Sequence, residues 1–233
     1  MTIISKIKKA LTDSKAVILK LNEFRIQNFI LMNSKVIHDF FFIQIGSNDG
    51  KTSDPLHKFI TKYKWRGILI EPVPHLFKKL KSTYKNYNNL TFENVAIANK
   101  EGYKDFFRIK ENNEPNNPDW YDQIGSFNKN IILKHRDEIP NFDKYFIKEK
   151  IKCLTFQSLI KKNNVKKIDL LHIDAEGYDL EIIKTINFNE IKPRMILYEH
   201  LHLSNLDKNS CNELLKKEGY KLIVKYGDTF AHL

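Results

Sequence analysis

Residues 40–50 read FFFIQIGSNDG, a run of mostly apolar side chains that ends in a turn bounded by Gly46 and Gly50. A central strand of a parallel sheet has this continuous apolar pattern, because helices bury both of its faces. The two glycines allow a ligand to approach the backbone closely, since glycine lacks a Cβ atom. The stretch therefore predicts a first strand that carries a binding turn at one edge of a parallel α/β sheet.

Four further apolar runs follow along the chain, and most stop at a polar residue. They cover residues 67–70, 90–97, 168–173 and 195–198. Helical patterns lie between most of these runs, at residues 55–63, 74–84, 179–186 and 209–218. Alternating strands and helices form βαβ units, so we expect a Rossmann-like, mainly parallel sheet with helices on both faces.

The two ends of the chain depart from this alternation. Residues 220–225 and 229–233 flank Gly227-Asp228, which predicts an antiparallel hairpin at the edge of the sheet. Residues 1–36 mix apolar residues with lysines at helical spacing, which predicts an amphipathic helical appendage. This appendage has three possible roles, which are to cap the domain, to join copies in a homo-oligomer, or to rest on a membrane surface.

The main domain is expected over residues 37–233, with an insertion at about 110–140. The insertion begins with a polar, turn-rich stretch and continues with aromatic residues. Because it interrupts the strands of one sheet, we expect a lid or a substrate loop.

The composition limits the classes of binding partner that we expect for this chain. The chain has 233 residues and a formal net charge of +11, which favours nucleic acid, phosphorylated or nucleotide-linked substrates, or a membrane surface. The lysines are scattered, which makes a dedicated nucleic-acid surface the less favoured alternative. The two cysteines lack metal-site spacing, and neither a membrane-spanning run nor a signal peptide is present. We therefore expect a cytoplasmic protein.

Ligands of open α/β sheets bind at the carboxyl ends of the strands. Polar or glycine positions occur there after five predicted strands, namely Gly46 to Gly50, Glu71, Asn94, Asp174 and Glu199. The turn is not a GxGxxG motif, which disfavours a pyrophosphate cradle and a nicotinamide-dependent oxidoreductase. Glu71 follows the turn by about twenty residues, where a carboxylate accepts hydrogen bonds from both ribose hydroxyls.

Four segments together resemble the FkbM-type methyltransferase family. They are QIGSNDG (44–50), WRGILIEP (65–72), ENVAI (93–97) and HIDAEGY (172–178). The likeness extends over roughly residues 40 to 231 and implies a class I methyltransferase fold with S-adenosylmethionine as methyl donor. It also implies O-methylation of a sugar or of a related natural-product hydroxyl.

The resemblance assigns donor contacts by position. The glycine turn would face the methionine part, Glu71 would bind the ribose, and Asn94 or Val95 would border the adenine. The full predicted donor set is Gln44, Gly46, Ser47, Asn48, Asp49, Gly50, Glu71, Pro72, Asn94, Val95, Asp174 and Glu176. Gln44 stands where many class I enzymes have an acid, so Asp49 is an alternative source of the charge that meets the methionine ammonium.

Methyl transfer is an in-line displacement, for which the enzyme aligns the donor and deprotonates the acceptor. The predicted catalytic residues are His200, Asp174 and Glu199, with His200 as the base. Asp174 and Glu199 also form a predicted Mg²⁺ or Mn²⁺ site, unless Asp174 only positions the donor. The predicted substrate contacts are Ser126, Trp120, Tyr121 and His202, whereas His172 is expected to be a satisfied core histidine.

The resemblance, together with the basic charge, thus predicts an O-methyltransferase that acts on a hydroxyl of a saccharide or glycan precursor, including nucleotide-linked or phosphorylated forms. A nucleic-acid or other small-molecule methyltransferase and a non-catalytic donor-binding scaffold are the alternatives. The sequence has no Asn/Asp-Pro-Pro-aromatic motif of amino-methylating enzymes and no separate basic RNA-binding module, which makes a nucleic-acid acceptor less favoured.

Overall fold

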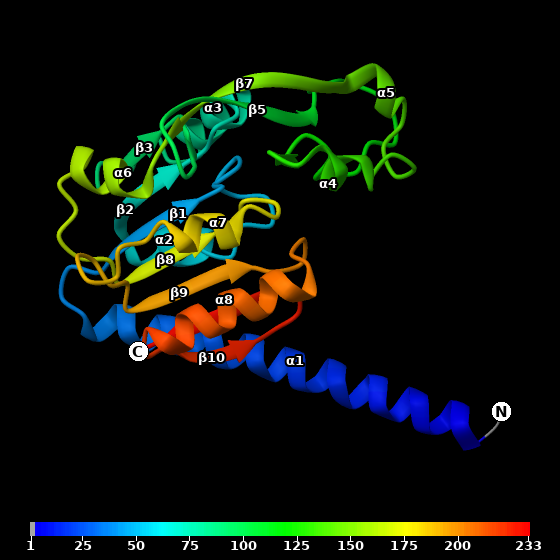
Figure 1. Ribbon diagram of the computed structural model, residues 1–233, viewed down its shortest axis with the longest axis horizontal. Helices are drawn as coiled ribbons and strands as arrows, with labels where there is room; N and C mark the ends of the chain where they lie inside the picture. Colours follow the sequence, from blue (N-terminus) through cyan, green and yellow to red (C-terminus); the bar gives the residue numbers. More distant parts are fainter. Residues whose placement is uncertain (1–2) are drawn as a thin grey trace.

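The computed structural model describes residues 3–233 and is built around a seven-stranded sheet (Figure 1). Its strands are β1 (Phe41–Ile45), β2 (Arg66–Ile70), β3 (Leu90–Glu93), β8 (Leu170–Ile173), β9 (Met195–Glu199), β10 (Lys221–Val224) and β11 (Asp228–His232). They lie in the order β10-β11-β9-β8-β1-β2-β3. The strands from β9 to β3 are parallel, and β11 pairs antiparallel with both β9 and β10. The predicted parallel sheet with a C-terminal hairpin is confirmed.

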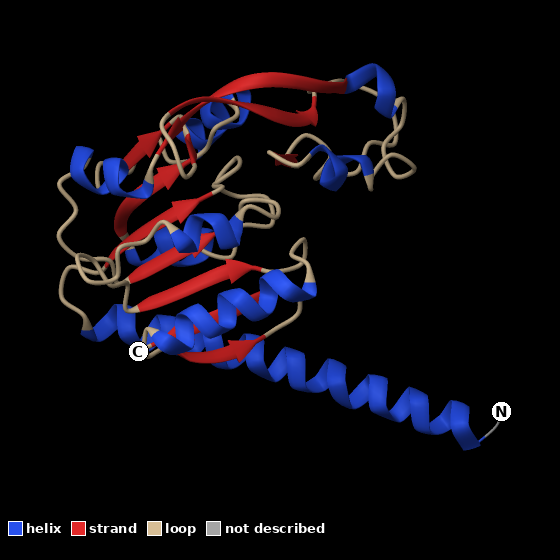
Figure 2. Cartoon of the chain, in the orientation of Figure 1, coloured by secondary structure: helices blue, strands red, loops and turns tan. Residues whose placement is uncertain are grey.

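Helices cover both faces of this sheet (Figure 2). One apolar core includes side chains of α6 (Phe156–Lys162), α7 (Asp179–Lys184) and α8 (Asn205–Lys217). A second core, on the opposite face, includes side chains of α1 (Ile3–Val36), α2 (His57–Tyr63) and α3 (Pro74–Thr83). Because side chains alternate along a strand, Ile43 and Ile45 of β1 face the first core, whereas Phe42 faces the second.

A second sheet, which the sequence did not predict, covers the carboxyl edge of the first. It consists of β4 (Ala96–Ile97), β5 (Gly102–Ile109), β6 (Gly125–Ser126) and β7 (Phe146–Leu154), in the order β4-β7-β5-β6. Figure 1 shows β5 and β7 as a long arch, with α5 (Phe142–Tyr145) at its far end and α4 (Lys129–Leu133) returning toward the main sheet. The predicted insertion is the part of the chain that connects β5 to β7.

The prediction of one strand over residues 90–97 is wrong. Residues 90–93 belong to the main sheet, whereas Ala96 and Ile97 belong to the second sheet. Between them, the side-chain amide of Asn94 donates to the carbonyl oxygens of Glu71 (2.8 Å) and Pro72 (3.0 Å). These bonds attach the chain to the end of β2 and direct it away from the main sheet.

The N-terminal appendage is a single helix, α1, and its second half packs on the domain. Ile26 and Ile30 are buried in the second core, and the Asn22 side chain donates to the carbonyl oxygen of Val224 (2.8 Å). Figure 1 shows the first half extending beyond the domain. The division at residue 36 and a role in oligomerisation stay predictions. Within residues 3–233, the helices are too short or too polar to traverse a lipid bilayer.

Candidate active site

Two cavities meet at the carboxyl edge of the main sheet. One is lined by Glu71 and Pro72 at the end of β2, and we call it the Glu71 lobe. The other is lined by Gln44 and Asp54 and is called the Gln44 lobe. Five residues line both lobes, namely Gly46, Asn48, Gln123, Asp174 and Glu176. The lobes therefore form one crevice at the carboxyl edge of the sheet, the position at which open α/β sheets bind ligands.

The turn after β1 separates the lobes and requires glycine at its first position. Gly46 has φ +78°, and a Cβ atom there would lie 1.8 Å from the carbonyl oxygen of Asp174. Ser47, which lines the Gln44 lobe, accepts a hydrogen bond from the backbone N–H of Ile70 (3.1 Å) through its hydroxyl oxygen. The turn is thus held against the ends of both neighbouring strands.

Two predicted contacts in this turn have structural roles instead. Both carboxylate oxygens of Asp49 accept hydrogen bonds within the turn, from the backbone N–H groups of Lys51 and Thr52 and from the Thr52 hydroxyl. A Cβ atom at Gly50 would lie 2.5 Å from the Leu80 side chain, so this glycine permits packing on α3. Neither Asp49 nor Gly50 lines a lobe.

Glu71 is the buried carboxylate of the first lobe, with only 2% of its surface exposed. One oxygen accepts from the backbone N–H of Asn48 (2.9 Å) and the other from that of Val73 (2.8 Å). Burial raises the pKa of Glu71 to about 7, although these hydrogen bonds and the charge of Arg108 oppose the rise. The carboxylate is therefore fixed in orientation, and its remaining lone pairs suit paired hydroxyl donors.

An apolar wall completes the Glu71 lobe. It consists of Val73, Ala96, Ile97, Phe106 and Phe127 together with Ile45, Ala175 and Ile182. The predicted wall residues Asn94 and Val95 do not line the lobe, because the Asn94 amide is bonded to the end of β2 and Val95 packs in the core. From this segment, Ala96 and Ile97 line the lobe instead, two positions further along the chain. The phenylalanines of the wall come from the second sheet and from the insertion.

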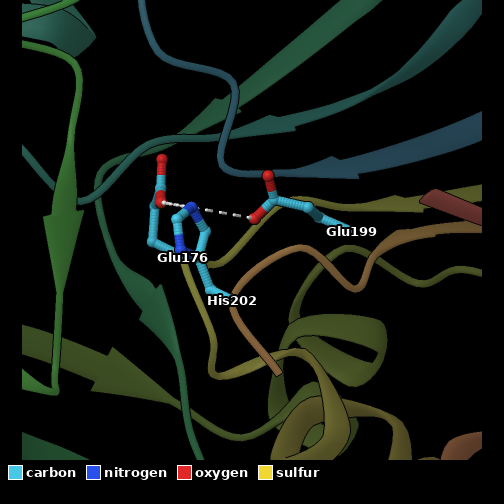
Figure 3. A group of neighbouring side chains, drawn as sticks. All are labelled: Glu176, Glu199 and His202. Carbon is cyan, nitrogen blue, oxygen red and sulfur yellow. Dashed lines mark ion pairs between the residues drawn. The ribbon is translucent and has the colours of Figure 1, made fainter. Parts of the chain in front are cut away.

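A cluster of Glu176, Glu199 and His202 lies beside the crevice (Figure 3). His202 Nε2 is 3.1 Å from Glu176 Oε2 and 3.9 Å from Glu199 Oε2. One ligand atom from each of the three residues lies within 4.8 Å of the others. The structure therefore groups Glu199 with Glu176 and His202, whereas the predicted metal pair combined it with Asp174.

The carboxyl groups around this cluster repel one another. Burial raises the pKa of Glu199 to about 10, and the charges of Asp174 and Glu176 add to the rise. Burial likewise raises the pKa of Asp179 to about 8 and that of Asp174 well above its ordinary value, with the charge of Glu176 contributing to both. A cationic ligand in the crevice would relieve this repulsion.

A comparison of the sequence with models of known protein families identifies the family of this chain. The model of the methyltransferase FkbM domain matches residues 44–222. This chain belongs to the FkbM methyltransferase family. It is accordingly an S-adenosylmethionine-dependent methyltransferase, and its sheet order is that of the class I fold.

Several solved methyltransferase structures are similar to the chain. Precorrin-6y C5,15-methyltransferase from Geobacter metallireducens is 11% identical, with coverage of 90% of this chain and 89% of its own and a TM-score of 0.44. The N-terminal domain of human METTL16, solved in complex with SAH, is 13% identical, with coverages of 90% and 68% and a TM-score of 0.45. Aeropyrum pernix fibrillarin with natively bound S-adenosyl-L-methionine is 10% identical, with coverages of 83% and 65% and a TM-score of 0.38. A search of curated proteins found no match.

The two histidines that follow β9 in this methyltransferase have different surroundings. His200 Nδ1 lies 2.9 Å from the Thr229 hydroxyl of β11, and burial lowers the pKa of His200. His200 lines neither lobe, whereas His202 contacts Glu176, which lines both. The assignment of His200 as the base stays a prediction, and the geometry favours His202.

The other predicted substrate contacts also differ in their surroundings, since one lines the crevice and two bond to the main chain. Trp120 lines the Gln44 lobe of the methyltransferase. The Ser126 hydroxyl donates to the main-chain carbonyl of Glu176 (2.8 Å), and the Tyr121 hydroxyl donates to that of Asn112 (2.6 Å). Ser126 and Tyr121 therefore hold the insertion in place. Sequence reasoning missed Gln123 and Phe106 as lining residues, and it did not include Asp54 in the site.

Replacing Glu199 with glutamine is expected to raise the melting temperature at pH 8 by about 3–6 °C, which corresponds to ~1–2 kcal/mol. The folded-state pKa of Glu199 is raised, so its contribution to stability is present below pH 4.5 and is lost as the pH rises toward about 10. Glutamine does not ionise, so the variant does not lose this stability as the pH rises. Thermal melts at pH 5 and pH 8 check the effect, with exposed Glu190→Gln as control. Equal gains at both pH values would exclude ionisation as the cause.

Proposed function

We propose that this methyltransferase transfers the methyl group of S-adenosylmethionine to a hydroxyl of a saccharide or glycan precursor. The observation that carries the proposal is the two-lobed crevice around the Gly46 turn. The Glu71 lobe takes the adenosine, with the Glu71 carboxylate accepting from the two ribose hydroxyls and the adenine lying between Ala96, Ile97 and the phenylalanines. The amino-acid part extends into the Gln44 lobe.

The charge of the crevice supports this donor. S-adenosylmethionine carries a sulfonium next to the methyl group, and Asp174 and Glu176 line the junction of the lobes where that group would lie. Opposite charges attract strongly in a partly buried site. The same carboxylates would repel a pyrophosphate, which disfavours a dinucleotide cofactor.

The acceptor hydroxyl must lose a proton, and His202 is the group we assign to accept it. His202 Nε2 lies 3.1 Å from Glu176 Oε2, and when Nε2 carries the hydrogen of the neutral ring, Nδ1 keeps a lone pair that can take the proton. The Glu176 carboxylate then stabilises the imidazolium that forms, as the acid of a carboxylate–histidine pair does in other enzymes.

Two features favour a carbohydrate acceptor. The indole of Trp120 in the wall of the Gln44 lobe offers an apolar face on which a sugar ring can pack. The net charge of +11 suits a phosphorylated or nucleotide-linked sugar of the kind used in polysaccharide biosynthesis. Because a nucleobase can also stack on an indole, the test includes RNA as an acceptor.

The test is incubation with donor labelled in the methyl group and panels of sugar nucleotides, sugar phosphates and RNA. Label in a sugar hydroxyl supports the proposal, and label found only in RNA contradicts it. If S-adenosylhomocysteine binds and no acceptor gains label, the chain is a donor-binding scaffold.

The predicted Mg²⁺ or Mn²⁺ would find its ligands in Glu176, Glu199 and His202. Because His202 Nε2 is already paired with Glu176, we assign these residues to proton transfer instead. Treatment with EDTA is therefore expected to leave turnover unchanged. Loss of turnover that Mg²⁺ or Mn²⁺ restores would show that a metal ion activates the acceptor.

A further inference from the structure

The Gln44 lobe contains a carboxylate that supplies the charge Gln44 itself lacks. Gln44 is only 1% exposed, and its side-chain amide donates to Asp54 Oδ1 (3.1 Å). The same oxygen accepts from the backbone N–H of Leu56 (2.7 Å). Asp54 is therefore held at the end of the Gln44 side chain, although it lies ten residues later in the sequence.

Four polar atoms of residues that line this lobe lack a hydrogen-bond partner within the described part of the chain. Glu176 Oε2 is one of them and lies at the junction of the two lobes, whereas Gln44 Oε1, Asp54 Oδ2 and His172 Nδ1 belong to residues that line the Gln44 lobe alone. His172 is 3% exposed and lies beside Gln44, since β1 and β8 pair these two residues directly. Buried polar atoms are nearly always paired in folded proteins, so several unpaired atoms in one cavity point to a ligand that satisfies them.

The chemistry of these atoms defines the ligand group. An amide oxygen and a carboxylate oxygen only accept hydrogen bonds, and an ammonium group provides three N–H donors with a positive charge. Burial keeps His172 neutral by lowering its pKa to about 3, so its ring adds no competing positive charge.

We propose that Asp54, positioned by Gln44, binds the ammonium group of the donor's methionine part. The assignment rests on the proposed function, because it requires S-adenosylmethionine in the crevice. Glu71 lines only the first lobe and Asp54 only the second, so the two carboxylates hold opposite ends of the crevice. In the donor, the ribose and the amino-acid part are also polar groups at separate positions, so each can meet one of these carboxylates. Asp49, the alternative from sequence, lines neither lobe and bonds to residues of its own turn.

The variant Asp54→Asn removes the charge and keeps an oxygen for the Leu56 N–H. Calorimetric titration should show S-adenosylhomocysteine bound about ten- to a hundredfold more weakly, as expected for a lost charge-assisted hydrogen bond. Methylthioadenosine, which lacks the amino-acid part, should bind within about twofold of the wild-type affinity. The matched variant Glu71→Gln should weaken both ligands.

The outcomes separate this inference from the proposed function. If the wild-type protein binds neither ligand, the proposed function fails. If the wild-type protein binds both and Asp54→Asn weakens both equally or neither, only the assignment of Asp54 is wrong.

Two further measurements keep the inference testable should Asp54→Asn fold poorly. The variant Gln44→Met retains the side-chain length but removes the amide, and it should show the same selective loss of S-adenosylhomocysteine. An S-adenosylhomocysteine analogue without the amino group should bind the wild-type protein at least about tenfold more weakly. Equal affinity for the analogue would overturn the ammonium contact.

Discussion

Replacing Gly46 with alanine is expected to weaken binding of S-adenosylhomocysteine by more than about a hundredfold, or ~3 kcal/mol. The added Cβ atom would lie 1.8 Å from the carbonyl oxygen of Asp174, so the turn and the end of β8 must separate. Both residues line both lobes, which means that the separation distorts the whole crevice. The clash and the positive φ together should also lower the free energy of unfolding by about 2–4 kcal/mol.

The chain offers a matched control for this variant. Gly219 has φ +89°, close to that of Gly46, and a Cβ atom there would meet nothing within 4 Å. Gly219→Ala should therefore show only the conformational cost, about 1 kcal/mol, with unchanged ligand affinity. Calorimetric titration and thermal melts measure both quantities. Normal binding by a folded Gly46→Ala protein would remove the turn from the donor site.

Replacing His202 with alanine is expected to reduce turnover by about two to four orders of magnitude, the range typical of general bases. The affinity for S-adenosylhomocysteine should change little, because His202 lines neither of the two lobes that we assign to the donor. Replacing Glu176 with glutamine should reduce turnover as well, since the imidazolium then lacks its partner. Single-turnover rates with labelled donor measure the chemical step directly.

His200→Ala is the informative comparison, since His200 is separated from His202 by one residue and hydrogen-bonds to Thr229 on β11. If His202 is the base, the His200 variant should retain turnover within about tenfold of the wild type. The reverse pattern would restore His200 to the role that the sequence predicted. Equal large losses in both variants would indicate that the loop after β9 acts as a unit.

The main sheet and the glycine-bounded turn after β1 were predictable because their signals are local. An apolar run followed at once by a glycine-bounded turn identifies β1, and the acid at the end of the next run identifies Glu71. The same local pattern indicates the hairpin around Gly227-Asp228. In each case, neighbouring residues supply the physical reason for the structure.

The second sheet and the assignment of side chains to the ligand could not be predicted in the same way. Both depend on contacts between segments that lie far apart in the chain. Phe106 of β5 pairs with Glu149 of β7 across the whole insertion, and nothing in the intervening sequence specifies that partner. The sequence also does not show which way a side chain points in the loop after a strand. For this reason the sequence predicted His200 and not His202 as the base. Asp54 had a visible signal in the Asp-Pro pair after the turn, but its bond to Gln44 appears only in the folded chain.

The hydrogen bond between Ser126 and the Glu176 carbonyl joins residues fifty positions apart in the sequence. Glu176 has φ +47°, a conformation that leaves its backbone little freedom to adapt. Displacement of the insertion must therefore either break this bond or shift the partner of His202. In the proposed mechanism, an acceptor that fits the insertion poorly would misalign the proton-accepting pair, so discrimination between acceptors would arise in the rate of reaction as well as in affinity.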